Sequence, residues 1–366
     1  MKRLILRTLA ILLGLLAGLL VGEGIVRVWG TGVPAEIERA IRLTERIDDV
    51  PRLGYALRAN ARDEQRYPAS SLGPARVVRY ATNRHRLRGT DFELVAPEGT
   101  FRIACVGDSF TFGTGVQDLE TWPAVLEREL RARGELVEVL NAGVMGYDAR
   151  QQVTWLTGRV LDFEPDLVVL CTYLNDLGPP RKQDRPEDYA DLARMVRFGL
   201  TARAPQRGVE RTVAERRMGM VRRASKLVDL LAYRLHARWN ASYTAERTRR
   251  GFDPEGRAFE EYATALELAR ERCGVAGAEL HLALYPVPAG LDDYPFEAIH
   301  TQVAALASRL GIPFHDLLEP LEALGDSNPI VHPSDAHPSP QAQAAVGRFL
   351  ALAIETTPEG DTLKGD

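Results

Sequence analysis

The chain has 366 residues, of which 45% are hydrophobic and 26% charged, and its formal net charge is −4. This ordinary globular composition excludes a mainly disordered chain, a collagen, a coiled coil and a membrane protein with many spans. General nucleic-acid binders are usually basic, so the acidic balance predicts no nucleic-acid partner. The cysteines, Cys105, Cys171 and Cys273, have neither zinc nor disulfide spacing, which predicts structural thiols.

Three basic residues within the first seven positions precede an uncharged apolar run of 15 residues, Thr8–Gly22. A run of this length is at the upper limit for a signal-peptide core and below the ~20 residues of a full span. No small-residue cleavage site precedes Glu23, which favours an uncleaved signal anchor over residues 1–30 in the inner membrane. The basic start then predicts a periplasmic catalytic domain. A cleaved signal peptide with secretion of the protein, or a buried soluble helix, are the alternatives.

Residues 31–100 are polar, with short β-like patches such as Val77–Ala81, which predicts a linker and an N-terminal edge element. From residue 101 to about 356, apolar runs alternate with stretches of helical spacing. We expect strands at Arg102–Val106, Leu136–Leu140, Leu167–Thr172, Glu279–Leu284 and Pro313–His315, and helices at Thr121–Arg133, Ala149–Leu161, Glu260–Arg272, Phe296–Leu310 and from about Gln341. This alternation predicts βαβ units and a parallel sheet. Residues 357–366 are expected to be a disordered tail.

A basic segment interrupts the alternation between the third and fourth strands. Residues 181–250 contain 18 Lys or Arg and 8 Asp or Glu, a local charge of +10. We interpret residues 177–255 as a helical insertion in the main domain. An insertion at the carboxyl end of a parallel strand lies beside the usual ligand crevice, which predicts a cap over the site. A solvated helical decoration is the alternative.

Ser109 is the candidate nucleophile, because Gly107-Asp108-Ser109 form a turn directly after the first strand. Serine needs a base to remove its proton. His337, with Asp335 two residues earlier, is the candidate base and orienting acid. His332 competes for the role of base, although its nearest preceding acid is six residues back.

Two further positions would complete an oxyanion hole with the backbone N–H of Ser109. Gly146 follows the second strand, and its missing side chain permits close approach of its N–H to a substrate. Asn175 ends the third strand and offers a side-chain amide. The alternatives are that Gly146 only shapes a turn and that Asn175 only caps one. Asp176 is interpreted as an acceptor for local backbone donors.

These four separated blocks resemble those of the SGNH hydrolases, also called GDSL-type esterases. Ser109, Gly146, Asn175 and His337 match the serine, glycine, asparagine and histidine that give the family its name, over about residues 101–353.

There are two departures from the family pattern. Tyr173 stands where the third block usually has glycine, and Ser334 stands where the last block often has its acid. The first departure predicts a narrower pocket. The second places the nearest acid, Asp335, two residues before His337.

The resemblance implies a fold and a chemistry. The fold is a three-layer α/β/α sandwich, flavodoxin-like, with about five parallel strands. The activity is that of a serine esterase or acylhydrolase with an acyl-serine intermediate and no metal or organic cofactor, acting by hydrolysis or acyl transfer. O-acetyl esters of cell-envelope or exported glycans are the expected substrates. The alternatives are a lysophospholipase or thioesterase acting on lipids, and a catalytically silent glycan-binding or assembly protein.

Overall fold

In the computed structural model, the described residues are 2–29, 42–47, 49–50, 53–174, 176–177, 248–288, 291, 294–325, 329–333 and 335–354. Asn175, most of the predicted insertion and the predicted tail lie outside them. The chain divides into two units, Met1–Ile41 with Arg181–Glu246 and Arg42–Pro180 with Arg247–Asp366, and each is considered by itself.

The described part of the first unit is one helix, α1 (Lys2–Trp29). No helix among the described residues is both long and apolar enough to cross a membrane. The transmembrane anchor predicted for residues 1–30 is therefore not supported. Its uncharged run of 15 residues corresponds to about 22 Å of helix, against a hydrocarbon core of ~30 Å.

The second unit is built on a five-stranded parallel sheet with the order β6-β5-β7-β8-β9. Its strands are β5 (Phe101–Gly107), β6 (Val137–Gly143), β7 (Leu167–Tyr173), β8 (Glu279–Tyr285) and β9 (Phe314–Asp316). The prediction of about five parallel strands is confirmed. The chain proceeds outward from β5 in both directions, so the topological switch point lies between the carboxyl ends of β5 and β7.

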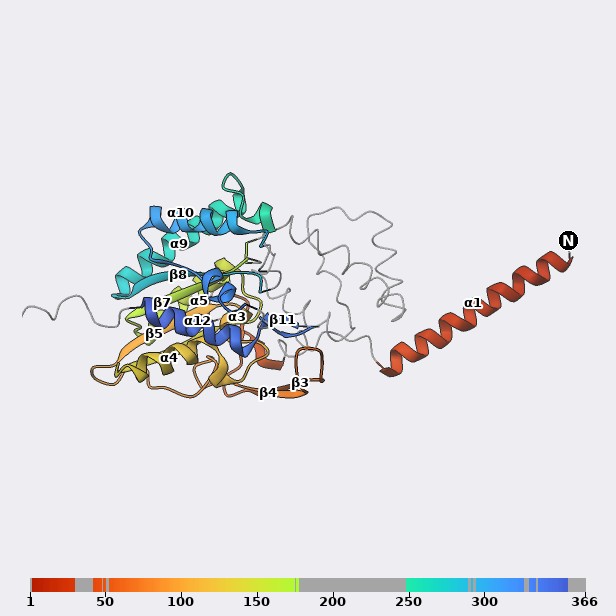
Figure 1. Cartoon of the computed structure of the whole chain (residues 1–366), viewed down its shortest axis with the longest axis horizontal. Coiled ribbons are helices and arrows are strands. Elements are labelled where there is room, and N and C mark those ends of the chain that lie inside the picture. Colours follow the sequence, from red (N-terminus) through yellow and green to blue (C-terminus); the bar gives the residue numbers. More distant parts are fainter. Residues whose placement is uncertain are drawn as a thin grey trace, which may run out of the picture. The chain divides into compact units, whose positions relative to one another are not determined.

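Helices cover both faces of this sheet, which confirms the three-layer architecture (Figure 1). One face carries α4 (Trp122–Ala132), α11 (Leu318–Glu322) and α12 (Pro340–Ala353). The other carries α5 (Ala149–Gly158), α9 (Arg257–Ala276) and α10 (Glu297–Leu310).

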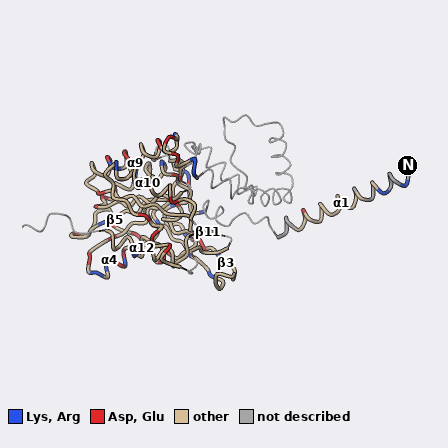
Figure 2. Tube along the Cα trace, turned by 45° about the horizontal axis from the view of Figure 1, so that its top comes forward, with Lys and Arg blue, Asp and Glu red and all other residues tan. Residues whose placement is uncertain are grey.

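The central strands are apolar because both of their faces are covered. Every residue of β7 up to Thr172 is buried. The core under α4 and α12 includes Ile103, Trp122, Val169 and Leu350, all fully buried. In Figure 2 the charged residues of this unit lie mostly on outer helices and loops. Burial of the apolar strand side chains thus supplies the main driving force for assembly of the sheet.

Residues 42–100 differ from the predicted linker and edge element, because they belong to the same compact unit as the sheet. They form two antiparallel hairpins, β1 (Thr44–Arg46) with β2 (Tyr55–Leu57) and β3 (Arg62–Tyr67) with β4 (Arg76–Ala81). Neither hairpin extends the main sheet, and an isolated bridge joins Arg88 to Asn141 of β6. The hairpins instead pack by burying aromatic side chains such as Tyr80.

Candidate active site

Ser109 begins the short helix α3 (Ser109–Phe112) directly after β5. The carboxylate of Asp108 accepts a hydrogen bond of 2.8 Å from the Phe110 N–H and caps this turn. A Cβ on Gly143 of β6 would lie 2.2 Å from the backbone nitrogen of Phe112. Only glycine at this position therefore allows β6 to pass so close to the turn that carries Ser109.

The structure brings Ser109, His337 and Asp335 into one hydrogen-bonded chain. His337 Nε2 lies 2.9 Å from Ser109 Oγ, and His337 Nδ1 lies 2.6 Å from Asp335 Oδ1. An ionised carboxylate only accepts hydrogen bonds, so Nδ1 carries the proton and Nε2 is left to accept from Ser109. The expected partnership of Asp335 with His337 is present, although their spacing departs from the usual family pattern.

A hairpin near the C-terminus decides between the two candidate histidines. Its strands are β10 (Ile330–His332) and β11 (Asp335–Pro338). His332 pairs in register with Asp335, whereas His337 extends from β11 to Ser109. Of the two candidates, His337 is therefore the histidine that contacts Ser109.

Asp335 is held in its ionised form. Burial by itself would raise the pKa of its carboxyl. The hydrogen bonds and charge attraction of His337, together with a hydrogen bond from Tyr67, outweigh burial and hold this pKa well below its usual range. The carboxylate is thus charged at neutral pH and can stabilise an imidazolium on His337.

The loop after β6 places Gly146 at the same edge of the sheet. Gly146 has a φ of +80°, which favours glycine. Tyr55 Oη donates a 3.0 Å hydrogen bond to the neighbouring Met145 carbonyl, and a Cβ on Gly146 would lie 3.1 Å from Tyr55 Oη. The loop is therefore held from one side by the first hairpin.

Asn175 lies outside the described residues, but its neighbours show how the turn after β7 is built. Asp176 Oδ2 accepts hydrogen bonds from the Tyr173 N–H, at 2.8 Å, and from Gln152 Nε2, at 2.7 Å. Burial first, and then the charge of Asp108, raises the pKa of Asp176 well above its usual value. Asp176 thus accepts hydrogen bonds from nearby donors, as the sequence suggested.

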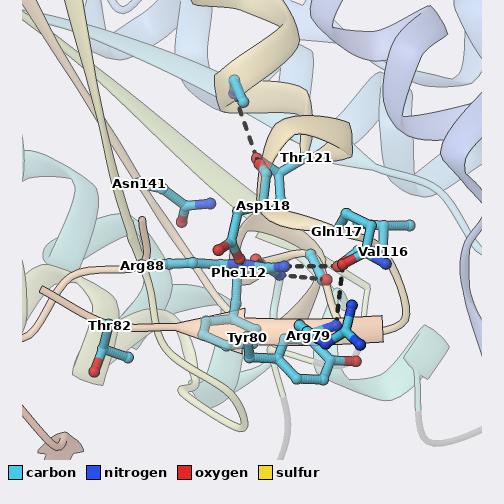
Figure 3. Close-up of polar contacts among 12 residues, drawn as sticks. Arg79, Tyr80, Thr82, Arg88, Phe112, Val116, Gln117, Asp118, Thr121 and Asn141 are labelled. Atoms are coloured by element: carbon cyan, nitrogen blue, oxygen red, sulfur yellow. Dashed lines mark hydrogen bonds and ion pairs between the residues drawn. The ribbon is translucent and has the colours of Figure 1, made fainter. Parts of the chain in front are cut away.

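Arg88 supports the turn that follows Ser109 (Figure 3). Its buried guanidinium donates to the carbonyls of Phe112, Gly113 and Val116, at 2.5, 2.5 and 2.6 Å. It also pairs with Asp118 at 2.9 Å. These bonds satisfy carbonyls at the C-terminal end of α3, which is too short to satisfy them itself.

Aromatic rings pack beside the nucleophile. Phe110 stacks on Tyr173 with ring centroids 3.9 Å apart, and it meets Tyr285 edge-on at 5.0 Å. Its ring centroid lies 5.4 Å from that of His337. Tyr173 thus packs on Phe110, the residue that follows Ser109 in the chain.

Sequence reasoning missed Tyr55, Tyr67 and Arg88, which all lie in the segment interpreted as a linker. The only local signal there was the β-like patch Val77–Ala81. A single tyrosine or arginine in a polar stretch does not reveal a partner far away in the chain. In the described ranges, no group of His, Cys, Asp and Glu is arranged to hold a metal ion.

Comparison with known proteins finds one family model that matches part of the chain. Residues 105–252 match the model of the GDSL-like Lipase/Acylhydrolase family. Similar solved structures include a lipase/acylhydrolase from Enterococcus faecalis, with 17% identity, coverage of 69% of this chain and 95% of that chain, and a TM-score of 0.40. Others are the psychrotrophic esterase EstA from Pseudoalteromonas sp. (14%, 68% and 93%, TM-score 0.38) and a catalytic mutant of an acetylxylan esterase from Geobacillus stearothermophilus (15%, 70% and 95%, TM-score 0.41). No curated protein matches the sequence.

Proposed function

We propose that this chain is an ester hydrolase of the GDSL-like lipase/acylhydrolase family, whose model matches residues 105–252, and that it works through an acyl-serine intermediate on Ser109. The observation that carries the proposal is the hydrogen-bonded chain from Ser109 Oγ through His337 to Asp335. This arrangement activates a serine hydroxyl, because the imidazole accepts the proton as Oγ attacks.

The geometry supports a two-step reaction. Ser109 Oγ attacks the ester carbonyl while its proton passes to His337 Nε2, and Asp335 stabilises the imidazolium. The tetrahedral intermediate collapses, its C–O bond to the alcohol breaks, and Nε2 returns the proton to the leaving oxygen. A water molecule then attacks the acyl-serine with His337 again as base, which releases the acid and regenerates Ser109.

An oxyanion hole is the second part of the proposal. The backbone N–H groups of Ser109 and Gly146 follow neighbouring strands, and the Asn175 side chain is the proposed third donor. Donors aimed at a developing oxyanion lower the barrier by about 3–4 kcal/mol each. Replacing Asn175 with Ala should therefore lower kcat by about 10²–10³-fold.

We propose O-acetyl esters of glycans as substrates. The packing of Phe110, Tyr173 and Tyr285 beside Ser109 supports a short acyl group, because their rings occupy space that a long chain would need. The choice of a glycan as the alcohol part of the ester depends on a further proposal. We propose that the basic N-terminal residues and the apolar helix α1 direct export to the cell envelope. Cell fractionation with intact-mass analysis tests that location, and a cytoplasmic full-length product would contradict it.

Acyl-chain selectivity tests the proposed substrate. We expect turnover of p-nitrophenyl acetate well above that of the octanoate ester, and release of acetate from O-acetylated xylan. Tyr173→Ala should raise octanoate turnover relative to acetate, and Ser109→Ala should abolish both. Preference of the wild-type enzyme for octanoate would favour a lipid acylhydrolase instead. No Ser109-dependent turnover of any ester would favour a silent binding protein.

A further inference from the structure

Tyr67 reaches the active site from the N-terminal hairpins. It ends β3, is 5% exposed, and its Oη donates a 2.6 Å hydrogen bond to Asp335 Oδ2. The two residues are 268 positions apart in the sequence. Figure 1 shows the β3–β4 hairpin and β11 at the same end of the sheet.

The bond fixes the carboxylate at both of its oxygens. Asp335 Oδ1 accepts from His337 Nδ1 at 2.6 Å and from the His337 backbone N–H at 3.2 Å, while Oδ2 accepts from Tyr67. A carboxylate held at one oxygen alone can rotate about its terminal bond. With both oxygens bound, Oδ1 stays directed at the imidazole.

The surroundings of Tyr67 are shaped to admit its hydroxyl. A Cβ on Gly115 would lie 3.0 Å from Tyr67 Oη and 2.6 Å from a methyl group of Val331. Gly115 also has a φ of +89°. Among the described residues, His337 on β11 and Tyr67 on β3 contact the carboxylate, and the ring centroid of His332 lies 5.6 Å from that of Tyr67.

We propose that Tyr67 is a positioning residue of the catalytic relay, so that the chain Tyr67–Asp335–His337–Ser109 acts as one unit. This inference rests on the proposed serine-esterase function. It makes the hairpin at residues 62–81 part of the active site. By donating to Oδ2, Tyr67 also withdraws charge from the oxygen that faces His337.

The test compares Tyr67→Phe with Tyr80→Phe. Tyr80 lies in the same hairpin, is equally buried and bonds Gln65 and the Gly115 N–H, but no bond joins it to Asp335. Tyr67→Phe should lower kcat/KM by about 10- to 100-fold, the value of a hydrogen bond to a charged group. It should also move the acidic limb of the pH profile upward, because the fuller charge on Asp335 stabilises the imidazolium. Tyr80→Phe should leave that limb in place.

A spectroscopic measurement separates this inference from the proposed function. The proton between His337 Nδ1 and Asp335 should give a downfield proton NMR resonance, which Tyr67→Phe shifts and Tyr80→Phe does not. If the wild type hydrolyses no ester but Tyr67→Phe still shifts the resonance, the proposed esterase function is wrong. The coupling of Tyr67 to the Asp335–His337 pair then still holds. An unmoved pH limb and resonance in Tyr67→Phe, with activity no lower than that of Tyr80→Phe, would overturn the role of Tyr67.

Discussion

Ser109 Oγ and His337 Nε2 lie 2.9 Å apart, although 228 residues separate them in the chain. Ser109 is placed by the turn after the central strand β5, and His337 by a hairpin just before the last helix. The turn after β5 and the hairpin that contains β11 must therefore be positioned accurately relative to each other for proton transfer.

Ser109→Ala should abolish labelling by a fluorophosphonate probe and reduce kcat by at least about 10³-fold, because alanine has no hydroxyl with which to form the acyl intermediate. Ser308→Ala, on the exposed side of α10, is the matched control and should label as the wild type does. Equal labelling of Ser109→Ala and the wild type would exclude Ser109 as the nucleophile.

Asp335→Asn should lower kcat/KM by about 10³–10⁴-fold, because an amide neither orients the imidazole in the same tautomer nor stabilises its charge. It should also change the pH dependence of stability. The folded-state pKa of Asp335 lies below the unfolded value of about 3.9, so its contribution is present above about pH 4 and is lost as the pH falls further.

Urea unfolding at several pH values measures this second effect. The wild type should exceed Asp335→Asn in free energy of unfolding at pH 7, and the difference should shrink below pH 4. Asp253→Asn, at an exposed site, should track the wild type throughout. A difference that stays constant from pH 7 to pH 3 would contradict the ionised state inferred for Asp335.

His315→Gln should flatten the loss of stability in mild acid. Burial first, and then the neighbouring His281, lowers the pKa of His315 to about 4. The pKa of this histidine in the unfolded chain is about 6.5. Between about pH 6.5 and pH 4, His315 is therefore protonated in the unfolded chain and neutral in the folded chain. The wild type should lose up to about 1.4 kcal/mol per pH unit from this residue between pH 6.5 and pH 4. Thermal unfolding across this window measures the slope, and an equal slope in His315→Gln would refute the assignment.

Arg88→Met should lower the free energy of unfolding by about 1–3 kcal/mol for each buried carbonyl left unsatisfied, because it leaves carbonyls of the Ser109 turn without their buried donor. Asp118→Asn removes the partly exposed partner of the same ion pair and should cost less than about 1 kcal/mol. Guanidinium denaturation of both variants gives the comparison. Similar losses in the two would show that the ion pair, not the support of the carbonyls, is the stabilising contact.

Much of the fold was predictable from local patterns. The apolar runs of β5 and β7 identify strands buried on both faces, and alternation with amphipathic helices implies a parallel sheet. Such patterns are short-range properties of the chain. They also place Ser109 and Gly146 after the carboxyl ends of parallel strands, and those strands, β5 and β6, are paired in the sheet.

The order of residues around His337 did not by itself settle its role, because His332 lies only five positions earlier. The choice came from a tertiary contact, because His337 Nε2 lies 2.9 Å from Ser109 Oγ, whereas His332 pairs with Asp335 across the hairpin. Such a contact joins segments 228 residues apart, so local sequence does not encode it.

The sequence by itself determined the sheet, its helices and the four blocks of the proposed site, because each is encoded in a short stretch of chain. Only the tertiary structure decided that Tyr55, Tyr67 and Arg88 support the site. Each of them forms a hydrogen bond with a residue far away in the chain, at separations that range from 24 to 268 positions. Nothing in the local pattern of residues 42–100 specifies those partners. Long-range side-chain hydrogen bonds become defined only when packing brings the two segments together, so their identity resides in the fold rather than in any local pattern.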